Sequence, residues 1–141
     1  MRTKLTLVVT GACLLIMAGA MPARAHHAFV AEFDANKPIT LVGTVTRTEW
    51  VNPHTWIHVE VKKPDGAVEK WAIEGGNPNA LLKRGFTKDS LKVGTEIHVE
   101  GYRAKDGTMR ANGRDIRLPD GRMLFLGSSG TGAPGDTGAE R

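Results

Sequence analysis

Histidine is the residue type in this chain best suited to binding chemistry, and four of the five histidines fall in two short segments. His26 and His27 are adjacent, and His54 and His58 lie four residues apart. A free α-amine beside imidazoles favours copper(II) or nickel(II), which prefer nitrogen-rich tetragonal sites. Cleavage of the chain before His26 would create such an amine. One hypothesis is therefore a copper site formed by His26, His27 and His54. The alternative is that these histidines are ordinary surface and loop residues.

The second histidine segment also holds a tryptophan, Trp56, between His54 and His58. On a β-strand, residues four apart share a face but lie about 13 Å apart, too far to share one ion. At most one of these two histidines can therefore join an N-terminal metal site. His54, Trp56 and His58 are candidate ligand-binding residues on the polar face of a strand. The alternative is that Phe29 or Phe33 of an N-terminal arm covers Trp56.

Signals for catalysis are weak elsewhere in the chain. The single cysteine, Cys13, excludes a disulfide framework and any site built from paired cysteines. The carboxylates show no spacing typical of acid–base catalysis, and no serine stands in a nucleophile motif. We therefore expect a protein without enzymatic activity.

The first 25 residues are typical of a secretory signal. Arg2 and Lys4 precede an apolar stretch over residues 5–20, and Ala23-Arg24-Ala25 predicts cleavage before His26. The apolar stretch is short for a membrane anchor, so no membrane span is expected after cleavage. Cleavage removes three of the 19 basic residues and none of the 15 acidic ones, which lowers the net charge from +4 to +1. We expect a periplasmic or secreted protein that does not bind nucleic acid.

The remaining chain predicts a mainly β domain over residues 26–126, with an N-terminal arm, and a disordered Gly/Ser-rich tail over 127–141. Alternating apolar residues predict strands, and Asn77-Pro78 followed by Gly85 predicts one short helix. Gly43 indicates a bulge or a sharp bend in the first strand, as in a strand that curves through a small barrel. Trp71 is expected in the core, and Trp50 is ambiguous. The predicted strands are Ile39–Trp50, Thr55–Val61, Val68–Glu74, Thr95–Tyr102 and Met109–Leu118, with an extension over Arg122–Leu126.

This order of elements, β-β-β-α-β-β, is that of a small five-stranded barrel like the OB-fold. The competing architecture is a β-sandwich fragment, which a single helix between the third and fourth strands fits less well.

Several motifs of the mature chain resemble those of one bacterial family. They are HHAFVAEFDANKPITLVGTV, EWVNPHTWIHVEV, WAIEGGNPNALLKRGF, DSLKVGTEIHVEGYRAKDG and ANGRDIRLPDGRMLF. Together they are similar to exported proteins of the domain of unknown function 6152 family. The resemblance implies an exported, barrel-like domain and supplies no activity or catalytic residue.

These observations favour an exported binding module for an unidentified small ligand. The ligand would contact the N-terminal arm, the Asn52–His58 segment and the outer face of the barrel, where OB-folds bind extended ligands. Two alternatives remain: the copper-binding protein described above, and an envelope protein whose partner is another protein.

Overall fold

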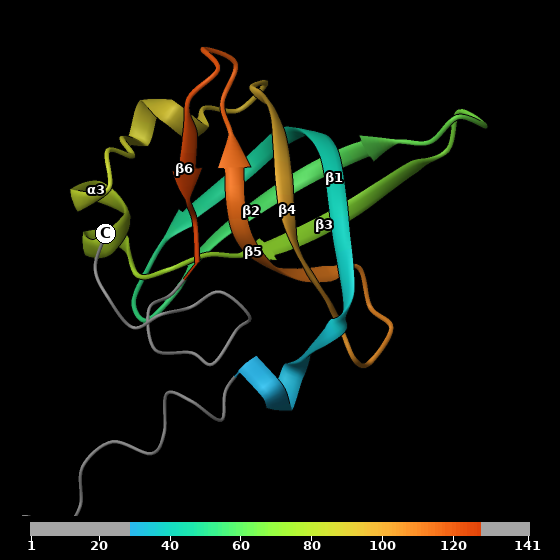
Figure 1. Ribbon diagram of the computed structural model, residues 1–141. Helices are drawn as coiled ribbons and strands as arrows, with labels where there is room; N and C mark the ends of the chain where they lie inside the picture. Colours follow the sequence, from blue (N-terminus) through green and yellow to red (C-terminus); the bar gives the residue numbers. More distant parts are fainter. Residues whose placement is uncertain (1–28, 128–141) are drawn as a thin grey trace, which may run out of the picture.

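A computed structural model describes residues 29–127 as a closed β-barrel with short helices at its surface (Figure 1). The sheet order is β3-β2-β1-β4-β5-β6, and a parallel pairing of β3 with β5 closes the ring. This confirms the predicted mainly β, OB-fold-like topology. The elements are β1 (Phe33–Trp50), β2 (Thr55–Lys62), β3 (Val68–Glu74), α3 (Pro78–Lys83), the 3-10 helix η1 (Lys88–Leu91), β4 (Glu96–Ala104), β5 (Arg110–Arg117) and β6 (Met123–Phe125).

Strand β1 is long because it pairs with two strands in turn. Its first part, from Phe33 to Thr44, pairs with β4, and its second part, from Thr44 to Trp50, pairs with β2. The strand therefore starts six residues before the expected Ile39, in a polar segment that shows no apolar alternation.

Of the two alternatives for Gly43, a bulge or a sharp bend, the bulge is not found at this residue. The irregular register between β1 and β2 falls between Val45 and Arg47. Gly43 instead allows a close approach of two strands, because a Cβ at this position would lie 3.1 Å from the Cβ of Val59.

The barrel interior is filled by alternate residues of the strands, which we call the barrel core. Trp71 is 5% exposed there, as expected, and Trp50 packs against the core while partly buried. The C-terminal extension also contributes: Leu126 is fully buried and packs closely on Gly75 and Gly113. The residues from Met123 to Leu126 therefore belong to the fold.

The predicted helix is present, with its predicted cap. The Asn77 side-chain oxygen accepts a hydrogen bond of 2.9 Å from the Ala80 amide, Pro78 opens α3, and Gly85 follows the helix at φ 93°. Helix η1 was not expected, because its short sequence KDSL has no helical apolar period. It is capped by a reciprocal pair of hydrogen bonds between Thr87 and Ser90.

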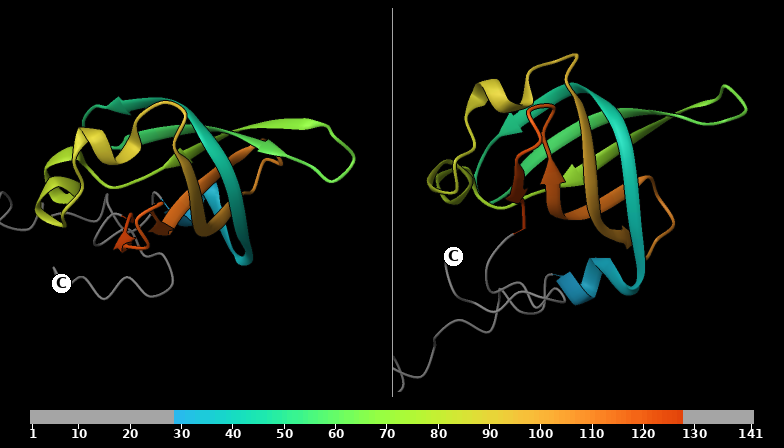
Figure 2. Two further views of the ribbon diagram at one scale, coloured as in Figure 1. Left: turned by 90° about the horizontal axis from the view of Figure 1, so that it is seen from above. Right: turned by 45° about the horizontal axis from the view of Figure 1, so that its top comes forward.

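A separate hydrophobic cluster holds the N-terminal arm, residues 29–33, against the outside of the barrel. The arm forms a helical turn over residues 29–32 beside the start of β1 (Figure 2). Its cluster, the arm cluster, consists of Phe29, Phe33, Tyr102 and Ala104. The Phe29 and Tyr102 rings meet edge to face, with centroids 5.5 Å apart.

The predicted signal peptide, His26, His27 and almost all of the predicted tail lie outside the described residues, so the domain boundaries stay predictions. Within residues 29–127, no helix is long and apolar enough to cross a membrane.

Candidate functional site

A row of outward-facing residues crosses all five strands of the barrel. Each member is the direct register partner of the next, and directly opposed residues share a face of the sheet. Their chain neighbours Ile57, Ile73 and Ala111 point into the barrel core, which confirms that the row faces outward. We call it the outer-face row: Glu49 on β1, Trp56 on β2, Glu74 on β3, Asn112 on β5 and Tyr102 on β4.

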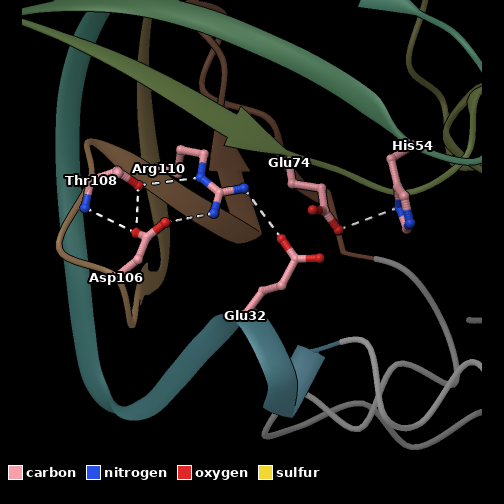
Figure 3. Close-up of polar contacts among 6 residues, drawn as sticks. All are labelled: Glu32, His54, Glu74, Asp106, Thr108 and Arg110. Carbon is pink, nitrogen blue, oxygen red and sulfur yellow. Dashed lines mark hydrogen bonds and ion pairs between the residues drawn. The ribbon is translucent and has the colours of Figure 1, made fainter.

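Two histidine–glutamate pairs flank Trp56, one on each side. His58 Nε2 lies 2.8 Å from Glu49 Oε1, and His54 Nδ1 lies 3.4 Å from Glu74 Oε1 (Figure 3 shows the second pair). His54 directly precedes β2, in agreement with the predicted strand start at Thr55. A different glutamate lies next to each of the predicted residues His54 and His58, on either side of Trp56.

The indole of Trp56 lies at the barrel surface. It is half-buried and belongs to neither the barrel core nor the arm cluster. The alternative that Phe29 or Phe33 covers Trp56 is wrong, because both phenylalanines pack with Tyr102. Trp56 also makes no hydrogen bond to another residue within the described part of the chain, so its Nε1–H is a donor that a ligand can use.

Glu49 is fixed by two partners on the same oxygen. Arg47 Nη2 lies 2.6 Å from Glu49 Oε1, the oxygen that also contacts His58. The distance between Arg47 Nη2 and His58 Nε2 is 3.1 Å. This arrangement neutralises the carboxylate and restricts its rotation. The first half of the row therefore presents a preorganised acceptor next to an aromatic ring.

A shallow groove of about 370 Å³ continues from this end along the outer surface of β1, β2 and β3. Ala72 is the register partner of His58, and its small side chain leaves the space open. The groove carries both signs of charge. Its lining includes Arg47, His58, Glu60, Lys70, Ala72 and Met109.

The second half of the row is buried although it is polar. Glu74 is 8% exposed and Asn112 is 3% exposed. Burial raises the pKa of Glu74 above its ordinary value, the nearby His54 opposes this shift, and the Glu32 carboxylate adds to it. The side-chain amide of Asn112 opposes the rise in the Glu74 pKa. A buried ionisable side chain of this kind is costly, which makes it a candidate for function.

A charged network next to Glu74 ties the arm to β5 (Figure 3). Arg110 lies 3.2 Å from Glu32 of the arm and 3.0 Å from Asp106. Thr108 donates two hydrogen bonds to Asp106, and these bonds, with Arg110, lower the pKa of Asp106 to about 2. The guanidinium of Arg110 also favours the ionised form of Glu74.

The predicted metal site is only partly within the described residues. His54 is described, whereas His26 and His27 are not. Within residues 29–127, no group of three or more His, Cys, Asp or Glu side chains is placed to hold a metal ion. His54 Nδ1 is buried, and its contact with Glu74 lacks the alignment of a hydrogen bond.

Sequence analysis missed Glu49, Glu74, Asn112 and Tyr102 as members of one site. Alternation within one strand shows which of its residues share a face, but it does not give the register between strands that aligns these four residues.

Comparisons with known proteins identify a family and two similar folds. A family described as "Family of unknown function (DUF6152)" matches residues 13–113. No curated protein matches the chain. The mitochondrial single-stranded DNA binding protein Rim1 of S. cerevisiae is 17% identical, with a TM-score of 0.43, and the match covers 59% of this chain and 94% of Rim1. The N-terminal domain of PriB from Thermoanaerobacter tencongensis is 25% identical, with a TM-score of 0.37, over 59% and 96% of the two chains.

Proposed function

The chain belongs to the DUF6152 family, and we propose that it is an exported, non-enzymatic binding module that holds an oligosaccharide on the outer face of its barrel. The observation that carries the proposal is Trp56. A half-buried indole outside both hydrophobic clusters stabilises the fold little, yet two histidine–glutamate pairs hold its surroundings in place.

The chemistry around Trp56 suits a neutral ligand rich in hydroxyl groups. The indole offers an apolar surface for the C–H faces of a sugar ring, and its Nε1–H donates. The flanking carboxylates accept hydrogen bonds, and a few fixed polar groups of this kind orient a ligand. Because Arg47 already pairs with Glu49, the charges around the Glu49–Trp56 half of the outer-face row largely balance.

The same face is poorly suited to nucleic acid. Binding to a phosphate backbone depends on an excess of Lys and Arg. Here Glu49, Glu60 and Glu74 lie among Arg47 and Lys70, so carboxylates would meet the phosphates.

Export to the periplasm or the medium is supported by the signal-like sequence over residues 1–25. Mass spectrometry of the mature protein from the producing cell is expected to show His26 at its N-terminus. An uncut N-terminus would contradict export with cleavage.

Calorimetric titration with chitohexaose tests the binding proposal. Trp56→Ala is expected to bind roughly 5- to 150-fold more weakly, because aromatic stacking contributes about 1–3 kcal/mol per base in nucleic-acid sites. Trp56→Phe keeps a ring and should retain much of the affinity. His98→Ala, which alters an exposed imidazole on β4, is the matched control and should bind normally.

Thermal unfolding of each variant separates loss of binding from loss of fold. Equal affinity of Trp56→Ala and the unchanged protein would refute the proposal. Absence of binding by the unchanged protein would also refute it and would favour a protein partner instead.

Copper binding is a second candidate function, supported by the buried, poorly aligned Nδ1 of His54. Both Glu32 of the arm and His54 act on the Glu74 carboxyl, so the arm and His54 lie near the same group.

The test is copper(II) titration of protein with an authentic His26 terminus, followed by electron paramagnetic resonance. A nitrogen-rich spectrum that changes in His54→Ala supports the site. A spectrum unaffected by that substitution excludes His54 as a ligand.

A further inference from the structure

The outer-face row has a partly exposed half and a buried half. Glu49 and Trp56 are half-buried, whereas Glu74, Asn112 and Tyr102 are each at most 8% exposed. The cover over Tyr102 is the arm itself, through Phe29 and Phe33.

The two halves are alike in chemistry. Each contains an aromatic side chain and a glutamate, and Asn112 adds an amide to the buried half. Adjacent strands are about 4.8 Å apart, so the path from Trp56 to Tyr102 crosses three steps and, because it bends around the closed barrel, measures at least roughly 14 Å along the sheet. A disaccharide on Trp56 would not reach Tyr102, whereas a longer chain of sugars would.

The contacts that hold the arm are local. The arm cluster shares no residue with the barrel core. Other contacts of the arm are the strand pairing of Phe33 with Ala104, the Arg110–Glu32 ion pair and two hydrogen bonds from Lys105, a 2.9 Å bond from its amide to the Glu32 carbonyl and a 2.5 Å bond from its Nζ to the Val30 carbonyl. Small satellite clusters of this kind open at lower free energy than the core. The arm can therefore detach while the barrel stays folded.

We propose that residues 29–33 form a strap that occupies the second half of the binding row, and that a long oligosaccharide displaces the strap to reach Glu74, Asn112 and Tyr102. This inference rests on the proposed function and adds to it the length of the ligand and its control. The strap selects long ligands, because only they gain contacts that offset the loss of the arm cluster.

The experiment compares two probes, chitobiose and chitohexaose, on full-length mature protein. Phe29→Ala removes the ring that packs on Tyr102, so fewer contacts between the strap and the barrel are lost when the ligand displaces the strap. The Phe29→Ala variant is expected to bind chitohexaose roughly tenfold more tightly, which equals about 1.4 kcal/mol. Its affinity for chitobiose should not change. Val30→Ala alters a 56% exposed residue of the same turn and should change neither affinity. Unchanged or weaker binding of chitohexaose by Phe29→Ala would overturn the proposal.

Hydrogen exchange gives a readout that needs no ligand. The Lys105 amide reports on the strap, because it donates to the Glu32 carbonyl, and the Val99 amide reports on the barrel. Phe29→Ala should speed exchange at Lys105 at least tenfold and leave Val99 unchanged. Equal acceleration at both amides would show that the arm is integral to the barrel and would overturn the strap.

Failure of the two proposals can be told apart. If neither sugar binds either protein, the proposed function fails, and the exchange rates alone decide whether the strap opens.

Discussion

Leu126 should be one of the costliest positions to truncate in the domain, although it lies past the last regular strand. Its side chain is fully buried and packs on Gly75 and Gly113, where any Cβ would come within 2.9 Å of it. Leu→Ala substitutions in cores cost about 3–5 kcal/mol when the neighbours cannot close the cavity. Glycines have no side chain that could rotate into the space. We therefore expect Leu126→Ala to lose about 3–4 kcal/mol.

Urea unfolding followed by circular dichroism measures this loss. In a domain of this size, each kcal/mol corresponds to about 4–8 °C in melting temperature, so a decrease of roughly 15 °C or more should accompany it. Met123→Ala, three residues earlier on β6, is the control, because Met123 is exposed and should change stability by less than about 0.5 kcal/mol. A loss below about 1 kcal/mol for Leu126→Ala would refute the conclusion that the C-terminal extension completes the core.

Three further substitutions test the site and its frame. Glu74→Gln should raise stability at neutral pH in urea titrations. Because the raised pKa means that the folded state binds the Glu74 proton more tightly than the unfolded state does, the Glu74 contribution to stability falls as pH rises from acid towards neutral, and the stability of the variant relative to the unchanged protein should increase over the same range. Asn77→Ala should cost about 1 kcal/mol in thermal unfolding, since the Ala80 amide loses its cap. Gly101→Ala should destabilise strongly or reduce soluble yield, because its Cβ would collide with the Asn112 carbonyl.

The barrel was largely predictable, because its signals are local in the chain. The alternation in β2 and β4 gives the buried face of each strand, and Asn77 with Pro78 marks the start of α3. The order of elements then restricts the topology to a few choices. The polar start of β1 was not predicted as a strand, because it has no apolar alternation of its own. Pairing with β4 makes it a strand.

The site was predictable only in part. His54, Trp56 and His58 are close in sequence, so their shared side of the barrel followed from their spacing. Glu49 and Glu74 come from other strands, and only the register places them beside Trp56. The arm is a similar case, since its two phenylalanines needed an apolar partner but the chain offers both Trp56 and Tyr102.

Nuclear magnetic resonance of labelled mature protein during chitohexaose titration tests the central claim most directly. We predict the largest shift at the Trp56 indole N–H, with a smaller shift at the Asn112 side-chain amide as the ligand crosses the row. Saturation without movement of the Trp56 signal, or largest shifts around His98 and Arg117, would contradict a binding site on the outer-face row.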